Sequence, residues 1–329
     1  MKLVLGFLAL AAAGEEWYRG NTHSHSNRSD GNAPPDAVVA AYRDLGYQFL
    51  VLTDHDQLTS VDGYGDPGAF LVISGEEVSA SHEGRPLHLT AVGLASPVAP
   101  RNEGAIADVI DRNAKAIREA GGLPILNHPN FGWFLEAEHL LATSEIRHFE
   151  LVNPHPVNNS SGGGGSPSVE ELWDRVLSRG RLLYAVAADD AHDYELAPFV
   201  STRGPAPRAN PGEAWVMVRA KALTAAAIQE ALAAGDFYAT TGVELLSYDV
   251  DANGIRMRLP TSYRYTVDVP GELRYRTFFI GENGRVLALD ESASPGYSFD
   301  GSELYVRARV EASDGTRLWT QPVFPGGPR

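Results

Sequence analysis

Between residues 17 and 241, short apolar runs alternate with amphipathic, alanine-rich segments that end at a glycine. The runs are brief and almost continuously apolar, as expected for strands that are buried on both faces. A glycine directly after a helix supplies the left-handed residue that ends it at little steric cost. This alternation predicts a parallel α/β fold, either a barrel or a doubly wound sheet. The predicted strands are 49–53, 70–74, 88–92, 123–127, 148–152 and 182–187, and the predicted helices are 35–45, 106–120, 169–179 and 224–234.

The sequence pattern changes after Thr241. Strands with period-two apolar character are separated there by turn sequences such as Asn253-Gly254 and Asp314-Gly315, which favour β-hairpins. We therefore expect an α/β unit over residues 15–242, followed by a small antiparallel β-sandwich over residues 243–329. The predicted strands of this tail are 245–251, 263–269, 273–280 and 304–310.

The first residues have the pattern of a secretory signal peptide. Lys2 precedes an apolar run over residues 3–13, and the run ends in alanines before a polar segment. We therefore expect residues 1–14 to direct export to the periplasm or the extracellular space. A buried first element of a cytoplasmic protein is the alternative. The run is too short to span a membrane, and no later stretch is apolar enough to do so.

The composition excludes several classes of function. The chain has 27 Lys and Arg against 42 Asp and Glu, a net charge of −15 with His neutral. It therefore lacks the basic surface that binding to extended nucleic acid requires, and a small-molecule substrate is the expected partner. The absence of cysteine excludes disulfides, thiolate-bound zinc and a thiol nucleophile. Any metal must be bound by nitrogen and oxygen, and the sequence carries no signal for an oligomeric state.

Histidines and carboxylates gather where the predicted strands end. His23 and His25 follow the first strand, and residues i and i+2 of an extended segment point to one side. Asp190 and His192 repeat this spacing after strand 182–187. The carboxyl ends of parallel barrel strands converge on one rim, where nitrogen and oxygen ligands would suit zinc, manganese or iron. The candidate metal ligands are His23, His25, Asp30, His55, Glu77, His88, His128, Asp190 and His192.

Together these motifs resemble the PHP (polymerase and histidinol phosphatase) family of metal-dependent hydrolases, over roughly residues 17–240. Spacing favours Glu77 over Glu76 and Asp190 over Asp189 as the matching carboxylates. The resemblance implies a distorted (β/α)7 TIM-like barrel. The motifs are His23-x-His25 with Ser29-Asp30-Gly31, Thr53-Asp54-His55-Asp56, Gly75-Glu76-Glu77, a lone His88, His128-Pro129 and Asp190-Ala191-His192.

The resemblance also implies a site for three divalent ions per chain. Mn, Zn and Fe are the metals that suit nitrogen and oxygen ligands of this kind. Glu77, Asp190 and His192 would be the catalytic residues, and a metal-bridging hydroxide would attack a small phosphorylated substrate. The implied ligand sets are His23, His25, Glu77 and Asp190 for one ion, Glu77, His88 and His128 for the second, and Asp30, His55 and His192 for the third.

Two other functions stay open at this point. The same site would also suit hydrolysis of an amide, carbamate or carboxylic ester, because the same nucleophile attacks a carbonyl carbon. The other alternative is a non-catalytic, exported metal-binding or adhesion module, in which the metals are structural and the β-sandwich attaches the protein to a surface.

Further residues are candidates for contacts with substrate or ligands. Arg203 could bind a substrate anion, and His155 lies beside a strand end and could touch substrate. Asp54 and Asp56 could orient His55, with capping of their own loop as the alternative. The remaining histidines are interpreted as structural or surface residues: His82, His139 and His148.

Overall fold

The computed structural model describes residues 14–194, 200–201, 204–205, 209–264 and 270–328. Nearly all of the predicted signal peptide, residues 1–14, lies outside these ranges, and so does Arg203. Export and a substrate contact by Arg203 therefore stay predictions. Within the described ranges, each helix is too short or too polar to cross a bilayer.

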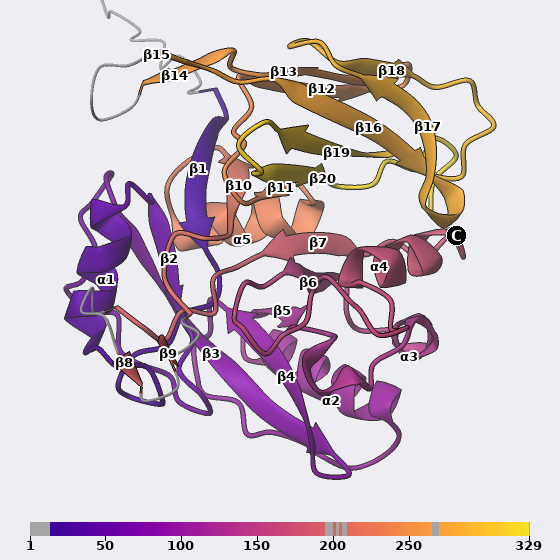
Figure 1. Cartoon of the computed structure of the whole chain (residues 1–329). Coiled ribbons are helices and arrows are strands. Elements are labelled where there is room, and N and C mark those ends of the chain that lie inside the picture. Colours follow the sequence, from indigo (N-terminus) through magenta and orange to yellow (C-terminus); the bar gives the residue numbers. More distant parts are fainter. Residues whose placement is uncertain (1–13, 195–199, 202–203, 206–208, 265–269, 329) are drawn as a thin grey trace, which may run out of the picture.

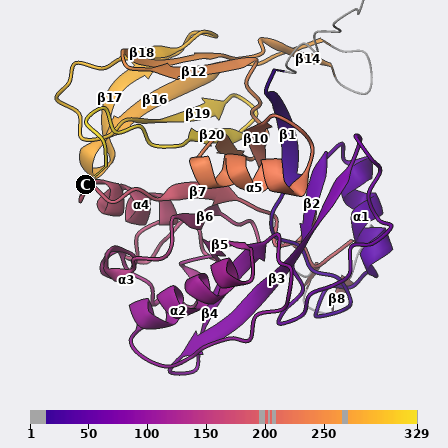
Figure 2. The same ribbon diagram turned by 180° about the vertical axis from the view of Figure 1, so that it is seen from behind.

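A 13-stranded sheet runs through the molecule, and its first part has the predicted alternation of strands and helices (Figure 1). Its strands pair in the order β1 to β7, and all of these pairs are parallel except the two that involve β4. Seen from behind, α2 (Ile106–Glu119) and α5 (Ala225–Ala234) lie on the near side of the strands (Figure 2). The strands are β1 (Glu16–Asn21), β2 (Phe49–Leu52), β3 (Leu71–His82), β4 (Arg85–Val92), β5 (Leu123–Leu126), β6 (His148–Val152) and β7 (Tyr184–Ala187), and the helices are α1 (Pro35–Asp44), α2 (Ile106–Glu119), η1 (Phe131–Trp133), α3 (Ala137–Ala142) and α4 (Val169–Leu177).

Local signals in the sequence explain where these elements begin and end. All four residues of β2 are buried, which accounts for its continuous apolar run. Ser168 caps α4: its Oγ accepts a hydrogen bond from the Glu171 backbone N at 3.2 Å, and Glu171 Oε2 accepts one from the Ser168 backbone N at 2.8 Å. Gly180 follows α4 with a φ of 80°, a conformation that favours glycine.

β4 departs from the parallel arrangement expected for residues 88–92. It is antiparallel to both β3 and β5, because β3 continues past residue 74 to His82 and turns back directly. The turn consists of Glu83 and Gly84, whose φ angles are 50° and 77°, as a tight β-hairpin requires. His88 therefore lies inside β4 rather than at the start of a strand, and it pairs with Ser79 of β3.

The segments that follow β1 and β7 are joined directly, although these strands come first and last in the series. Ser24 forms a parallel bridge with Ala191. The His25 backbone N donates to the Ala191 carbonyl at 2.9 Å, and the Asp190 backbone N donates to the His23 carbonyl at 3.1 Å. The polar residues after both strands are consequently side by side. The closed barrel stays a prediction.

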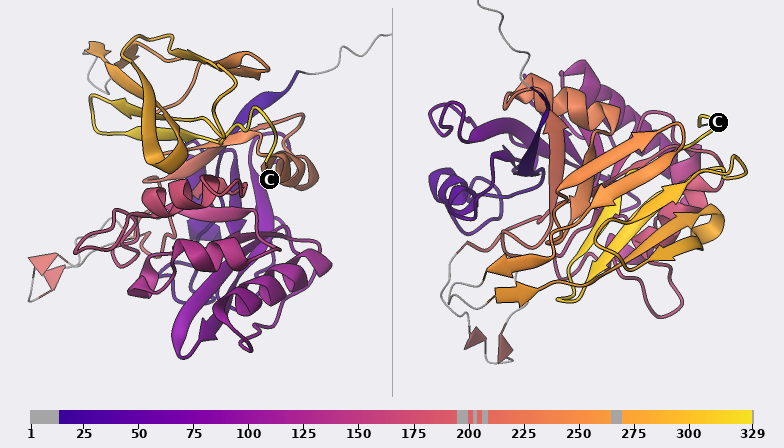
Figure 3. Two further views of the ribbon diagram at one scale, coloured as in Figure 1. Left: turned by 90° about the vertical axis from the view of Figure 1, so that its right-hand side faces the viewer. Right: turned by 90° about the horizontal axis from the view of Figure 1, so that it is seen from above.

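The tail is antiparallel, as predicted, and it shares the large sheet with the α/β part. β20 pairs with β11, so the sheet continues from β10 and β11 into β20, β19, β16 and β17. A second sheet, β12, β13 and β18, packs against it through Ile255, Met257 and Phe279 (Figure 3). The predicted boundary at residue 242 falls between β11 and β12; the division into two domains stays a prediction.

The remaining elements complete the chain. They are β8 (Val200–Ser201), β9 (Gly204–Pro205), β10 (Trp215–Ala220), α5 (Ala225–Ala234), β11 (Phe237–Thr240), β12 (Ser247–Asp251), β13 (Gly254–Arg258), β14 (Ser262–Arg264), β15 (Pro270–Glu272), β16 (Tyr275–Gly281), η2 (Glu282–Gly284), β17 (Arg285–Asp290), β18 (Gly296–Ser298), β19 (Arg307–Ala312) and β20 (Arg317–Thr320). The tail strand predicted at 263–269 lies mostly outside the described residues, since positions 265–269 are not among them.

Buried polar contacts attach the tail to the α/β part. Arg307 of β19 pairs with Asp174 of α4 through two hydrogen bonds, Nε to Oδ1 at 2.8 Å and Nη2 to Oδ2 at 2.7 Å. The Gln321 side chain binds the backbone of Ala185 in β7: its Oε1 accepts from the N at 2.8 Å, and its Nε2 donates to the O at 2.9 Å. The tail therefore covers polar backbone and charged groups of the α/β part.

Candidate metal centre

The side chains of the nine candidate ligands lie close together, most of them just after the carboxyl ends of strands. Eight of them form three overlapping groups, in each of which the possible ligand atoms lie within 4.8 Å of one another. His128 belongs to none of these groups, but its Nε2 is 3.4 Å from Glu77 Oε1. The first group is His23, His25, Glu77 and Asp190, the second is His55, Glu77 and His88, and the third is His25, Asp30, His55 and His192.

The first group is buried and tightly packed. The Nε2 atoms of His23 and His25 are 3.0 Å apart. Glu77 Oε2 lies 3.2 Å from His23 Nε2 and 3.1 Å from His25 Nε2. Asp190 Oδ1 lies 3.2 Å from each of the same two nitrogens. Four ligand atoms thus surround one small space.

These distances fit a divalent ion. Ligands bound about 2.0–2.2 Å from one ion are about 2.8–3.6 Å apart, depending on whether the geometry is octahedral or tetrahedral. Two imidazole lone pairs at 3.0 Å repel each other unless a proton or a cation lies between them. Imidazole nitrogen with carboxylate oxygen is a ligand set that zinc, manganese and iron accept. The residues therefore fit the metals that the sequence implied.

Glu77 connects this group to a second set of nitrogens. While Oε2 faces His23 and His25, Oε1 lies 3.0 Å from His88 Nδ1 and 3.4 Å from His128 Nε2. The Asn127 side chain also donates to Oε1 at 2.7 Å, which holds the carboxylate in place. One carboxylate thus presents its two oxygens to two sets of imidazoles, as a bridging ligand does.

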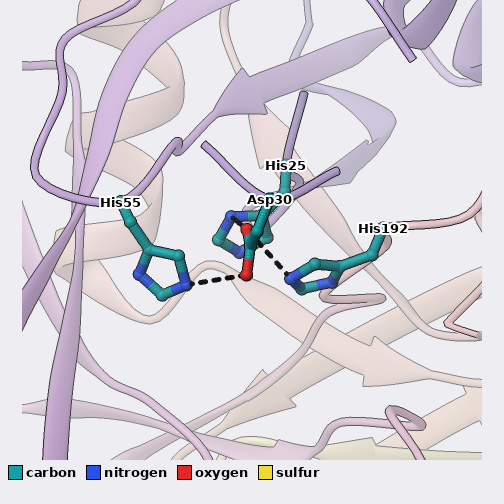
Figure 4. A group of neighbouring side chains, drawn as sticks. All are labelled: His25, Asp30, His55 and His192. Atoms are coloured by element: carbon teal, nitrogen blue, oxygen red, sulfur yellow. Dashed lines mark ion pairs between the residues drawn. The ribbon is translucent and has the colours of Figure 1, made fainter. Parts of the chain in front are cut away.

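The third group surrounds Asp30 (Figure 4). Asp30 Oδ1 is 3.3 Å from His25 Nδ1 and 3.3 Å from His192 Nε2, and Oδ2 is 3.5 Å from His55 Nε2. The Nδ1 of His192 is 2.8 Å from the Asp190 carbonyl, so as the protonated nitrogen it donates there and leaves Nε2 free to bind a ligand.

Exposure increases from the first group to the third. The side chains of His23 and His25 are fully buried, whereas that of Asp30 is 54% exposed. A small pocket of about 140 Å³ opens over the exposed side of the cluster. A substrate would therefore approach from the third group, while the first group is shielded from water. The pocket is lined by Asp30, His55, Glu77, His88, His128, Phe131, His155, Val157, Asn158, Asp190 and His192.

The charges of the cluster shift its pKa values strongly. Burial lowers the pKa of His23, but the carboxylates of Asp190 and Glu77 outweigh it and raise this pKa well above its ordinary value. Burial raises the pKa of Glu77, yet the His23 and His88 imidazoles hold it well below its ordinary value. Burial also raises the pKa of Asp30 and of Asp190, but neighbouring imidazoles outweigh it and hold both pKa values below the ordinary value. The cluster therefore attracts positive charge, which protons supply when no metal is bound.

A buried carboxylate that the sequence reasoning missed supports the first group. Glu150 of β6 lies 2.6 Å from His23 Nδ1 through Oε1, and its Oε2 accepts a hydrogen bond from the His128 backbone N at 2.9 Å. It fixes the His23 ring with Nε2 toward Asp190 and Glu77. The signal was present in the sequence, because a charged residue inside an otherwise apolar strand needs a polar partner.

Two asparagines in the loop after β6 were also missed. The Nδ2 atoms of Asn153 and Asn158 each donate to Asp190 Oδ2 at 3.1 Å. They hold the second oxygen of this carboxylate while Oδ1 faces the imidazoles. Asn153 follows directly after a strand, the position that identified the histidines, whereas nothing in the sequence singles out Asn158.

The expected orientation of His55 by Asp54 and Asp56 is wrong. His55 Nδ1 instead lies 2.7 Å from Ser79 Oγ. Asp54 accepts hydrogen bonds from Ser26, at 2.7 Å from the backbone N, and caps the loop that carries His25. Asp56 accepts from the Ser79 backbone N at 2.8 Å. Loop capping, the alternative reading, is what the contacts favour.

The ambiguous neighbours of the two central carboxylates point away from the cluster. Glu76 Oε2 accepts a hydrogen bond from the Val98 backbone N at 3.0 Å. Asp189 accepts from the backbone N atoms of Gly212, Glu213 and Ala214, at 2.9, 2.8 and 2.7 Å. Both are structural contacts.

The other histidines also have defined places. His148 is buried, its Nε2 lies 2.9 Å from the Leu232 carbonyl, and burial lowers its pKa to about 4. His139 accepts a hydrogen bond from the Glu136 backbone N at 3.0 Å. His155 lies in the pocket, with its ring centroid 5.2 Å from that of His192, and burial lowers its pKa. His155 is thus an uncharged imidazole beside the cluster near neutral pH.

Comparisons with known proteins give remote likenesses. Neither family models nor curated proteins match the chain. A two-domain protein of Bacteroides vulgatus, described as containing a predicted PHP-like metal-dependent phosphoesterase, is 16% identical, with 95% of this chain and 96% of that chain covered and a TM-score of 0.48. Its description names the family that the motifs resemble.

Two further solved structures are more distant. An amidohydrolase of Chromobacterium violaceum is 16% identical, with 53% of this chain and 87% of that chain covered and a TM-score of 0.37. A protein of Bifidobacterium adolescentis described as a candidate metal-dependent phosphoesterase is 14% identical, with 58% and 92% covered and a TM-score of 0.38. Because these likenesses are remote, the roles of individual residues rest on the geometry of the site.

Proposed function

We propose that this chain is a metal-dependent hydrolase that cleaves small phosphoesters at the cluster described above, with one divalent ion (Mn, Zn or Fe) for each of its three donor groups. The observation that carries the proposal is the position of Glu77, whose two oxygens face separate sets of imidazoles. A carboxylate in this position offsets the repulsion between neighbouring cations. The link between the ends of β1 and β7 supports a distorted barrel as the scaffold.

When bound, divalent ions would supply Lewis-acid charge and make water acidic enough to attack near neutral pH. His23 and His25 close the buried side of the cluster, so that attack takes place on the pocket side. Asp190 is held by Asn153 and Asn158, which keeps Oδ1 directed at the cluster. His192 presents Nε2 at the rim of the pocket, while its Nδ1 is held by the Asp190 carbonyl.

The reaction would consume one water for each ester. The water oxygen forms a bond to phosphorus, the bond from phosphorus to the leaving oxygen breaks, and a proton passes to that oxygen. A monoester gives an alcohol and inorganic phosphate, and a diester gives an alcohol and a phosphomonoester. His155 lies in the pocket outside the three donor groups and is placed to contact a substrate oxygen. The phosphoryl group would carry negative charge toward the cations, which favours a phosphoester over a neutral ester.

The test is to assay the full chain with Mn²⁺ on 4-nitrophenyl phosphate, bis(4-nitrophenyl) phosphate and 4-nitrophenyl acetate, and to measure bound metal by elemental analysis. We expect metal-dependent turnover of a phosphoester and more than one ion per chain. Glu77→Gln should lose turnover by at least about 100-fold and lower the metal content, because it removes the bridging charge. Glu76→Gln is the matched control, since the Glu76 side chain accepts a hydrogen bond from the Val98 backbone N and points away from the cluster.

Two results would overturn the proposal. Turnover of the acetate alone would assign the site to carbonyl chemistry, the first alternative from the sequence. If the wild type binds metal but hydrolyses none of the three esters, the non-catalytic metal-binding module would be favoured.

A further inference from the structure

The pocket over the metal cluster has an apolar side. Phe131 of η1 packs its ring against His128 and His88, with centroids 5.2 Å and 6.4 Å apart. Val157, in the loop after β6, lines the same pocket and is 49% exposed. These two side chains, termed the apolar rim, come from segments that are distant in sequence. Apolar side chains beside a small number of polar groups are typical of a ligand-binding pocket.

The charged residues of the pocket all belong to the metal cluster. Among the described residues that line it, the carboxylates are those of Asp30, Glu77 and Asp190, and neither lysine nor arginine occurs. The cations bound by the cluster would thus bind one anionic group. A second anionic group on the substrate would meet the apolar rim and lose its hydration, and the described residues that line the pocket offer it no cationic side chain.

We propose that the substrate's leaving group is a small, uncharged aryl or alkyl group that packs on Phe131 and Val157 while its phosphoryl group faces the cluster. This inference rests on the proposed function and deepens it. The products are the corresponding phenol or alcohol and inorganic phosphate, with the bonds changed as described above. Substrates with a second charge on the leaving group, such as sugar bisphosphates, are disfavoured for the same reason.

The turnover experiment compares phenyl phosphate with 4-carboxyphenyl phosphate on the Mn²⁺-loaded full chain. The two esters differ by one charge, at the end of the ring that would contact the apolar rim. We expect kcat/KM to favour phenyl phosphate by about tenfold or more. Phe131→Ala and the nearly isosteric Val157→Thr should each reduce this preference about fivefold, mainly through KM, because they remove apolar contact. Leu289→Thr, at an exposed position of β17 in the tail, is the matched control and should leave kcat/KM for both esters unchanged.

A binding measurement separates this inference from the proposed function. Phenylphosphonate, which is not hydrolysed, should bind the Mn²⁺-loaded chain about tenfold more tightly than methylphosphonate in calorimetry, and Phe131→Ala should abolish the difference. That preference without turnover of any ester would contradict the proposed function alone. Equal binding of both phosphonates, or equal or better turnover of 4-carboxyphenyl phosphate, would overturn the apolar leaving group, even in an active phosphoesterase.

Discussion

At the scale of single residues, the cluster depends on groups that hold the ligands as much as on the ligands. His23 and His192 each present one nitrogen to the cluster while a neighbour holds the other: Glu150 holds His23, and the Asp190 carbonyl holds His192. Such contacts choose the tautomer and reduce the rotamer freedom that metal binding would otherwise have to remove. Loss of a holding group should therefore weaken metal binding without removing a ligand.

Glu150→Gln tests this idea directly. Gln keeps the shape of the side chain but removes the charge that orients the His23 ring, so metal affinity should fall about 10- to 100-fold. Competition with a chelator of known affinity measures the change. Glu76→Gln, another buried carboxyl in the same part of the fold, should leave the affinity within about twofold. Equal losses in both variants would show that Glu150 supports only the fold.

His148 should make the stability of the fold depend on pH. Its pKa is about 4 in the folded chain against 6.5 as the ordinary value, because burial disfavours its charged form. Between these values the unfolded chain binds a proton that the folded chain does not. This contribution is therefore complete above pH 6.5 and is lost on acidification toward pH 4, by about 3 kcal/mol.

Urea unfolding of the wild type and of His148→Gln from pH 7.5 to pH 4, both with metal removed, measures this contribution. Gln retains an N–H for the Leu232 carbonyl but does not titrate, so the variant should lose less stability on acidification. Parallel curves for the two proteins would contradict the assignment of a depressed pKa to His148.

At the scale of elements, the β3–β4 hairpin and the contact of α4 with β19 determine most of the arrangement. The hairpin sends β4 back along β3, which places His88 beside Glu77. The α4–β19 contact depends on Arg307, whose guanidinium is buried, binds Asp174 and Glu170, and lies 4.7 Å from the Trp173 ring centroid. A charge buried so fully is stable only while its partners are present.

Arg307→Ala should lower the free energy of unfolding by about 3–5 kcal/mol, because it leaves the Asp174 carboxylate buried without a charged partner. Arg307→Lys should lose less, since it keeps the charge but not the paired hydrogen bonds. Arg256→Ala is the control: Arg256 pairs with Asp251 on the surface of the tail, and its loss should cost less than about 1 kcal/mol. Urea unfolding measures all three. A loss for Arg307→Ala no larger than the control would show that the α4–β19 contact contributes little.

At the scale of the whole molecule, the tail and the α/β part share one sheet and are joined by buried hydrogen bonds. β20 extends the large sheet from β11, and Gln321 satisfies both backbone groups of Ala185 in β7. Removal of the tail would uncover these groups together with the apolar surface that the tail covers. The tail is therefore expected to be necessary for folding, whatever it contributes to function.

A chain that ends at Gly242 should fail to unfold cooperatively and should aggregate, because β11 becomes an open edge and Asp174 loses its partner. Size-exclusion chromatography and thermal unfolding provide the measurement. A chain that ends at Pro325 lacks Arg329 and the exposed residues Gly326, Gly327 and Pro328, and it should behave as the wild type. A monomeric Gly242 variant that melts within a few degrees of the wild type would instead establish two independent domains.

Much of the fold and of the candidate site could be predicted from local patterns. Apolar runs and Gly-ended helices located β2, β5, β6 and β7 and the helices α1, α2, α4 and α5 to within a few residues, because burial and capping act over one or two turns of chain. The spacing of His23 with His25, and of Asp190 with His192, likewise depends only on the geometry of an extended segment. A feature that depends only on residues close together in the sequence could therefore be predicted from the sequence.

What only the tertiary structure decided depends on partners that are far apart in the chain. The direction of β4, the attachment of Gln321 to Ala185 and the approach of Glu150 to His23 each require a pairing across many residues. Such pairings are selected by the free energy of the whole packed molecule, in which a buried charge or backbone group must find a partner. By itself the sequence thus determined which elements form and which side chains gather at their ends, while long-range packing decided how those side chains are held.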